Sequence, residues 1–134
     1  MTGPPVVAII NTSNELVELL KVTLEGAGLV VVTTYLSEIR AANFDVETWL
    51  KVHDPRVVLY DVAPPFDRSW RFLDHLRSSP AFEGRRFVLT SPNVARVHEV
   101  VKTDETVYEV VGQAEDLDEI VRAVREAVRA RPTR

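Results

Sequence analysis

The sequence that decides the fold is Val57-Val58-Leu59-Tyr60-Asp61, which continues into Val62-Ala63 and then Pro64-Pro65. Four apolar residues in a row predict a central strand that is buried on both faces of a parallel sheet. A proline cannot donate a backbone hydrogen bond to a sheet, so the two prolines place the end of this strand just after Asp61. Asp61 is therefore expected at the carboxyl edge of the sheet, where open α/β sheets bind ligands. The alternative is that Asp61 only hydrogen-bonds the turn that follows the strand.

Length and composition limit the class of protein. A chain of 134 residues forms one domain with a single core. The net charge of -4 argues against a general nucleic-acid binder. The absence of cysteine excludes disulfides, thiolate zinc sites and cysteine nucleophiles. Residues 1–5 have no signal-peptide pattern, and no apolar run approaches the length of about 18 residues that a membrane span needs. We expect a cytoplasmic protein that binds neither nucleic acid nor a membrane.

Strands and helices are expected to alternate along the chain. Short apolar runs predict further strands at 6–10, 29–32, 87–89 and 107–111. Residues 36–41 could form a short helix. Thr12 with Glu15, Asn93, and Asp116 with Glu119 are expected to cap helices. Gly26 and Gly28 are expected to end the first helix. The residues at helical spacing are Leu16, Leu19, Leu20, Thr23, Leu24 and Ala27; Phe44, Trp49 and Val52, expected to face inward around a helix at 45–52; Trp70, Leu73 and Leu76; Val94, Val97, Val100 and Val101; and Ile120, Val124, Ala127 and Val128.

This alternation predicts an α/β protein with a five-stranded parallel sheet and helices on both faces. Right-handed crossovers and short connections favour a doubly wound, flavodoxin-like sheet of order 2-1-3-4-5. The loop at 11–14 then faces Asp61, with Thr90 and Ser91 beside it and Gly112-Gln113 closing the edge. We expect one domain over 1–134 with a core at about 6–128, a mobile basic tail at 129–134 and no output domain.

Other kinds of site fit the residues less well. Thr12-Ser13-Asn14 at a strand-to-helix turn could hold a phosphate, as in flavin mononucleotide binders, but the loop lacks glycine and helix capping explains the same residues. His53, His75 and His98 lie on three separate segments, which argues against a shared metal site. No G-x-S-x-G sequence is present, which argues against a serine hydrolase.

The sequence resembles the receiver domain of two-component response regulators over nearly its whole length. The matching pieces are the run 57–61 with Pro65 four positions after Asp61, a hydroxyl residue at the end of the fourth strand, and Asp116-Leu117-Asp118-Glu119-Ile120 at the start of the last helix. Their order and spacing together carry the resemblance. The stretch between the second and third strands is longer than in an ordinary receiver.

The resemblance implies a role for each matching position. Asp61 would be the phosphoacceptor, which attacks a phosphohistidine and becomes an aspartyl phosphate. Two acidic residues after the first strand, Asp61 itself and the backbone carbonyl of Ala63 would hold Mg²⁺. Ser91 by ungapped counting, or Thr90 one position earlier, would bind a phosphoryl oxygen. Such a protein is not an enzyme beyond its own phosphorylation and dephosphorylation.

Several positions depart from the receiver pattern. Asn11 and Thr12 stand where the acidic pair is expected, and Gln113 stands in place of the lysine that pairs with the phosphoryl group. Val110 stands in place of the aromatic residue of the fifth strand, although Tyr108 lies on the same strand face. Neutral oxygens bind Mg²⁺ less well than carboxylates do. A lost pair of unit charges at 4 Å is worth about 4 kcal/mol at an effective dielectric constant of 20. Phosphorylation and Mg²⁺ binding are therefore expected to be weak.

We consequently expect a degenerate, stand-alone receiver-like protein that acts in phosphorelay signal transduction by binding a protein partner. The partner would be a histidine kinase or a downstream signalling protein, held at 94–128 on the last two helices and the fifth strand; a homodimer through this face is the other option. The main alternative is a working phosphoacceptor on Asp61 with Mg²⁺, for which Arg68 could supply part of the missing charge. A small-molecule or nucleotide binder at the crevice between the first and third strands is a third hypothesis.

Overall fold

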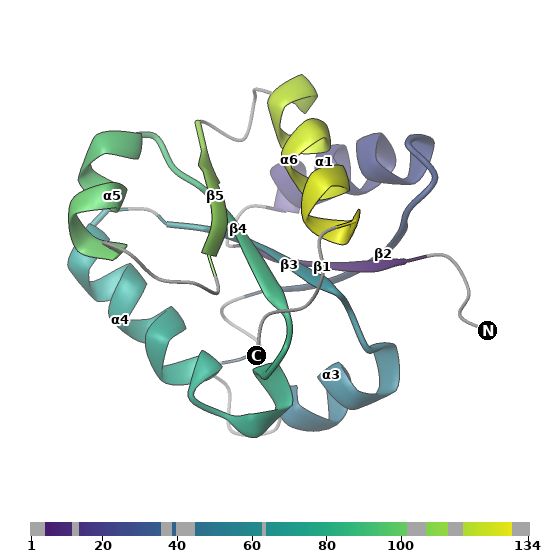
Figure 1. The fold of residues 1–134 in the computed structure, drawn as a ribbon, viewed down its shortest axis with the longest axis horizontal. Helices are drawn as coiled ribbons and strands as arrows, with labels where there is room; N and C mark the ends of the chain where they lie inside the picture. Colours follow the sequence, from purple (N-terminus) through teal and green to yellow (C-terminus); the bar gives the residue numbers. More distant parts are fainter. Residues whose placement is uncertain are drawn as a thin grey trace.

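A parallel sheet of five strands forms the centre of the protein. The structure, a computed structural model, describes residues 5–11, 14–35, 39, 45–62, 64–101, 107–112 and 117–129. The strand order is β2-β1-β3-β4-β5, as the sequence predicts (Figure 1). The strands are β1 (Val6–Asn11), β2 (Val30–Tyr35), β3 (Val57–Asp61), β4 (Arg86–Thr90) and β5 (Val107–Val111).

Helices cover both faces of the sheet, so the fold is doubly wound as predicted (Figure 1). Helices α1 (Asn14–Gly26) and α6 (Leu117–Arg129) cover one face. Helices α3 (Val46–His53), α4 (Phe66–Arg77) and α5 (Val94–Val101) cover the other. The short 3₁₀ helix η1 (Pro80–Phe82) follows α4 and packs against α3. Among the described residues, no helix is long and apolar enough to cross a membrane.

Strand β3 is buried on both faces, which is what its uninterrupted apolar run predicts. Val57 and Leu59 belong to the core beneath α1 and α6, whereas Val58 and Tyr60 belong to the core beneath α3, α4 and α5. Successive side chains of a strand alternate between faces. Asp61 therefore continues the row of Val57 and Leu59 and lies on the face of the sheet that α1 and α6 cover.

Strand β2 is longer than predicted. It extends to Tyr35, because Thr33 and Thr34 pair with Ile9 and Ile10 of β1. Threonine is β-branched and suits a strand when a neighbour is available to pair with it. The predicted end at residue 32 followed the end of the apolar run and could not include this pairing.

The buried face of α1 differs from the predicted stripe. Val17, Leu20 and Leu24 are buried, whereas Leu19 is 45% exposed. Val17 was not in the expected set, so the buried face of the helix is turned toward Val17 and away from Leu19. The end of the helix is as predicted, since Gly28 has a φ of 91° in the turn before β2.

Helix α3 also turns a different side to the core than predicted. Leu50 is fully buried, Trp49 is half-buried and Val52 is 71% exposed, so the inward placement of Val52 was wrong. The helix starts at Val46 because Asp45 caps it, accepting hydrogen bonds from the backbone N of Thr48 at 3.2 Å and from its hydroxyl at 2.7 Å. Position 52 then lies on the outer side, half a turn away from Leu50.

The later helices confirm the sequence analysis. Leu73 of α4, Val97 of α5 and Ile120 of α6 are buried, and so are Val124, Ala127 and Val128. Trp70 is half-buried against the core beneath α3, α4 and α5. The predictions for Thr12, Phe44 and Asp116 lie outside the described residues, as do those for 130–134 and, apart from Ile39, for the short helix at 36–41.

Candidate functional site

The Asp61 carboxylate and the Thr90 hydroxyl meet at the carboxyl edge of the sheet. Thr90 donates a hydrogen bond from Oγ1 to Oδ1 of Asp61 at 2.6 Å. The two residues are directly paired in register between β3 and β4, so their side chains stand on the same face. Asp61 is half-buried and Thr90 is buried. This distance is typical of the strong hydrogen bonds that hydroxyl groups donate to carboxylates.

Ser91, the other candidate for the phosphoryl ligand, is buried and bonds locally instead. Its Oγ accepts a hydrogen bond from the backbone N of Asn93 at 3.1 Å and lies 3.4 Å from the Asn93 carbonyl oxygen. Asn93 in turn caps α5 as predicted, since its Oδ1 accepts from the backbone N of Arg96 at 3.0 Å. Of the two hydroxyl residues, the structure therefore brings Thr90 to Asp61 and places Ser91 in the turn before α5.

Backbone hydrogen bonds hold this edge beyond the ends of the strands. The N–H of Val62 donates to the Thr90 carbonyl at 2.8 Å, and the N–H of Ser91 donates to the Gly112 carbonyl at 3.1 Å. These bonds continue the pairing of β3 with β4 and of β4 with β5. The residues that follow Asp61 and Thr90 are therefore fixed relative to each other by the sheet itself.

The other predicted site positions are placed less completely. Asn11 is the last residue of β1. Ile10 pairs with Tyr60 of β3, so Asn11 and Asp61 directly follow a paired position on two adjacent strands. Val110 of β5 is half-buried against the core beneath α3, α4 and α5, as an apolar residue can be. Three more predicted positions lie outside the described residues, namely Thr12, Ala63 and Gln113.

Asp61 is the carboxylate that could contribute to a magnesium site at this edge. Among the described residues, no three His, Cys, Asp or Glu side chains come together in a group that could hold a metal ion. Asp61 supplies one carboxylate, and one of its oxygens accepts the Thr90 hydrogen bond. Mg²⁺ is usually held by one or two carboxylates together with phosphate oxygens and water.

Charged residues link the helices that start at this end of the sheet. Arg96 of α5 forms an ion pair with Glu99 at 2.9 Å and reaches Asp67, in the first turn of α4, at 3.8 Å. The hydrogen bond to Glu99 and the charge of Asp67 raise the pKa of Arg96 above its ordinary value. Arg68, the cation considered for phosphoryl binding, is an exposed residue of α4.

Solved structures of response regulators match this arrangement over nearly the whole chain. A response regulator from Thermotoga maritima is 18% identical, with a TM-score of 0.69 over 96% of this chain and 100% of that one. This chain has the receiver fold. A similar match to the receiver fold is chemotaxis protein CheY4 of Vibrio cholerae, at 12% identity and a TM-score of 0.67 over 93% of this chain and 99% of that one.

Another structure with the receiver fold is described as a transiently phosphorylated switch in bacterial signal transduction. It is 18% identical, with a TM-score of 0.66 over 95% of this chain and 96% of that chain. By sequence, the chain matches no protein-family model and no curated protein. The receiver fold is thus retained while the sequence has diverged far from these structures.

Proposed function

We propose that this protein is a receiver-like signalling protein of a phosphorelay, which acts by binding a protein partner and is phosphorylated weakly or not at all. The observation that carries the proposal is the Asp61–Thr90 pair, at 2.6 Å, at the carboxyl end of the central strand of a receiver fold. A carboxylate and a hydroxyl are two of the groups that the receiver resemblance implies at this edge. Their meeting there supports a signalling site over a plain turn.

The proposal of weak phosphorylation follows from the charges that the sequence lacks. Phosphoryl transfer depends on positioning and on cations that offset the charge of the phosphoryl oxygens. Gln113 is neutral where a lysine is expected, and Asn11 and Thr12 are neutral where acidic metal ligands are expected. One lost pair of unit charges is worth about 4 kcal/mol at an effective dielectric constant of 20. If that energy were lost from the transition state, the rate would fall by about a thousandfold.

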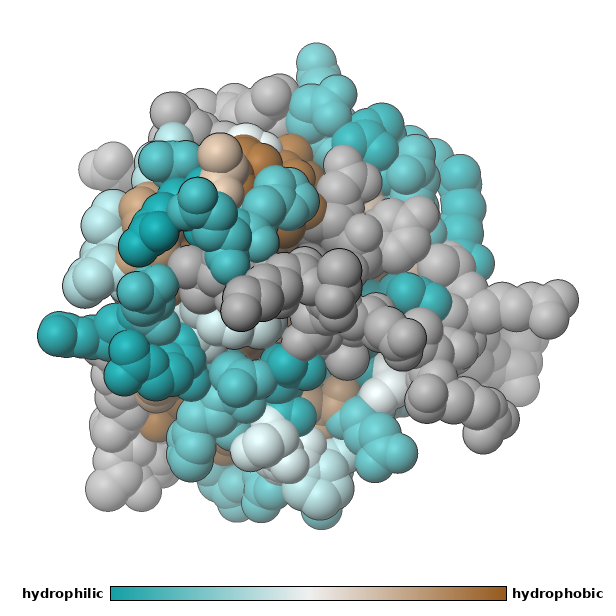
Figure 2. Space-filling model, turned by 60° about the vertical axis from the view of Figure 1, so that its left-hand side comes forward, coloured by the Kyte–Doolittle hydropathy of each residue, from teal (hydrophilic) through white to brown (hydrophobic). Residues whose placement is uncertain are grey.

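The proposed partner surface comprises residues 94–128, which include α5, β5 and most of α6. Its described helical residues carry charges of both signs, such as Arg96, Glu99, Arg122 and Glu126. Figure 2 shows the side of the molecule that carries α4 and α5, where hydrophobic residues reach the surface in small areas between hydrophilic ones. A surface that mixes charged and hydrophobic residues suits a partner that binds transiently, such as a histidine kinase or a downstream signalling protein.

One experiment separates weak from normal phosphorylation. The purified chain is incubated with Mg²⁺ and acetyl phosphate, and its intact mass is measured, with the transiently phosphorylated switch protein of similar fold as a positive control for the reaction. We expect the control protein to gain the mass of one phosphoryl group and this chain to remain unmodified. Asp74→Asn, which changes an exposed carboxylate of α4, is the matched control for Asp61→Asn.

The alternative function, a working phosphoacceptor, is favoured by the half-buried carboxylate of Asp61, which is not closed off from solvent. A phosphoryl adduct on the wild-type chain and on Asp74→Asn, but absent from Asp61→Asn, would establish this alternative and overturn the proposal of weak phosphorylation. An adduct that survives in Asp61→Asn would place the modification elsewhere and overturn the assignment of the site.

The partner surface is tested by binding to histidine kinases purified from the source organism. We expect Arg96→Glu, which reverses an exposed charge on α5, to weaken the binding of the kinase that the wild-type chain binds. Asp61→Asn should leave that binding within about twofold, because the proposed contact does not need a phosphoryl group. The opposite pattern, with Asp61→Asn abolishing binding and Arg96→Glu leaving it unchanged, would contradict the proposal.

A further inference from the structure

Strand β2 lies at one side of the sheet, and its sequence, Val30-Val31-Val32-Thr33-Thr34-Tyr35, carries no charge. Among the described residues, β2 pairs with β1 alone. The strand at the other side of the sheet, β5, includes Glu109. Edge strands of proteins that stay monomeric usually carry a charge, a proline or a bulge, because a regular edge pairs with other strands. The sequence of β2 has neither a charge nor a proline, and its pairing with β1 runs over the whole strand without a register shift.

The pairing with β1 decides which main-chain groups of β2 point to the outer edge. The N–H of Val30 donates to the Pro5 carbonyl at 3.0 Å, on the side where β1 lies. In a parallel pair of strands, every second residue bonds the same neighbour, so Val30 and Val32 both bond β1. The N–H and C=O groups of Val31 and Thr33 therefore point away from β1, to the outer edge of the sheet.

The side chains along this edge are β-branched and in part exposed. Val30 is 41% exposed, and Val32 and Thr33 are half-buried. Val31 belongs to the core beneath α1 and α6, and Thr33 lies on the same face of the sheet as Val31. β-Branched side chains pack well against one another across paired strands. A strand added at this edge would therefore cover apolar surface and also bond the main chain.

We propose that β2 pairs in the antiparallel direction with β2 of a second copy of this chain, about a two-fold axis at Val32. Val32 then stands opposite the partner's Val32, Val31 opposite the partner's Thr33, and Val30 opposite the partner's Thr34. Each pair of Val31 with Thr33 exchanges both of its main-chain hydrogen bonds, because these are the two residues whose N–H and C=O groups point outward. The pairing joins the two sheets into one continuous sheet.

A second copy fits this edge because the match is symmetric and uncharged. Two-fold pairing of residues 30–34 places only valine and threonine opposite one another. It brings no two like charges together, which would disfavour a pair of strands. Strand β5, which belongs to the proposed partner surface at 94–128, lies at the other side of the sheet. The inference therefore does not depend on the proposed signalling function.

The test measures self-association of the full chain by sedimentation velocity, at concentrations from about 10 μM to about 1 mM. We expect an equilibrium between monomer and dimer. Thr33→Lys places a charge on the paired edge of both copies and should weaken the dimer about tenfold. Val30→Lys, at the more exposed position, should also weaken it and serves if Thr33→Lys fails to fold. Val52→Lys places the same charge on the exposed side of α3, so it is the matched control and should dimerise as the wild type does.

Amide hydrogen exchange of the ¹⁵N-labelled chain, followed by NMR, locates the contact. The amides of Val31 and Thr33 should exchange more slowly as the protein concentration rises, whereas those of Val30 and Val32 already bond β1 and should not change. Protection of Val31 and Thr33 that is equal at all concentrations would overturn the proposal, because the edge would then be covered within one chain.

Two results of the sedimentation experiment would also overturn it. One is a chain that stays monomeric over the whole concentration range. The other is a dimer that a folded lysine variant of β2 leaves at full strength, because the two copies would then meet at another surface, such as the one at 94–128.

Discussion

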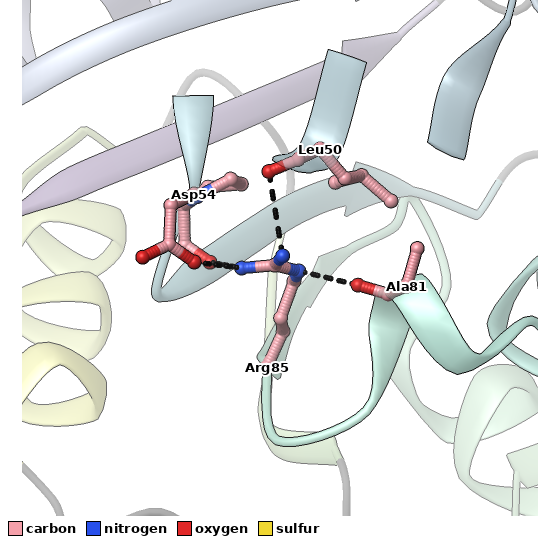
Figure 3. Close-up of polar contacts among 5 residues, drawn as sticks. Leu50, Asp54, Ala81 and Arg85 are labelled. Carbon is pink, nitrogen blue, oxygen red and sulfur yellow. Dashed lines mark hydrogen bonds and ion pairs between the residues drawn. The ribbon is translucent and has the colours of Figure 1, made fainter. Parts of the chain in front are cut away.

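Arg85→Met should reveal how much of the stability depends on one arginine that connects α3, η1 and the start of β4. Methionine keeps most of the apolar stem and removes the guanidinium group. The Leu50 carbonyl, which accepts from Nη2 of Arg85 at 3.3 Å, also accepts a hydrogen bond from the backbone N of Asp54 at 2.7 Å, so it stays satisfied in the variant. The bonds that Arg85 donates to the Ala81 carbonyl at 2.7 Å and to the Pro55 carbonyl at 2.8 Å are lost (Figure 3). Hydrogen bonds from charged donors contribute about 1.5–3 kcal/mol each, so we expect a loss of about 3 kcal/mol in the free energy of unfolding.

The ion pair with Asp54 is expected to contribute much less, because the Asp54 side chain is 83% exposed. Exposed ion pairs contribute about 0.2–1 kcal/mol. Asp54→Asn removes the charge and keeps a residue that tolerates the left-handed backbone found here, where φ is 48°. We therefore expect Asp54→Asn to cost less than about 1 kcal/mol, and Arg85→Lys to fall between the two variants because lysine keeps the charge without the fork.

The assay is urea unfolding followed by tryptophan fluorescence, since Trp49 lies in α3 itself. With a slope of about 1–3 kcal/mol per molar urea, the loss for Arg85→Met corresponds to a midpoint lower by roughly 1–3 M. Raising the salt concentration should leave this difference in place, because salt screens exposed charges and not the buried bonds. If Asp54→Asn costs as much as Arg85→Met, or if salt removes the difference, then the ion pair is the source of the stability and the bonds to the Ala81 and Pro55 carbonyls are not.

Three further predictions concern the site and the helices. Thr90→Val removes the donor of the 2.6 Å hydrogen bond and should cost about 1–2 kcal/mol by urea unfolding, whereas Thr90→Ser should cost less. The hydroxyl and the backbone N–H of Thr48 lower the pKa of Asp45 below its ordinary value of 3.8. The stability that Asp45 contributes is therefore present above pH 3.8 and is lost as the pH falls through the lowered pKa of the folded state. Asp45→Asn should flatten the acid side of a plot of stability against pH, and an unchanged plot would refute this. On α3, replacing the buried Leu50 by alanine should lower the free energy of unfolding by about 2–5 kcal/mol. Replacing the exposed Val52 by alanine should lower it by less than about 0.5 kcal/mol. Equal costs would mean that the helix packs against the sheet with a different face.

The sequence alone determined the sheet and the position of its central carboxylate. An apolar run that ends at two prolines predicts a buried strand that stops near Asp61, and the structure has β3 at Val57–Asp61. The fifth strand, at Val107–Val111, has the predicted ends, and Asn93 caps α5 as its position suggested. These features depend on neighbouring residues, on backbone chemistry and on local spacing, all of which can be read along the chain.

The tertiary structure decided which side chains meet. Thr90 and Ser91 are both hydroxyl residues, and the count along the sequence favoured Ser91, but the pairing of β3 with β4 sets Thr90 opposite Asp61. Adjacent residues of a strand point to opposite faces, so a difference of one position in the pairing changes which hydroxyl reaches the carboxylate. Arg85 shows the same limit, because its partner Asp54 lies 31 residues away, and only the packing of η1 against α3 brings the two together.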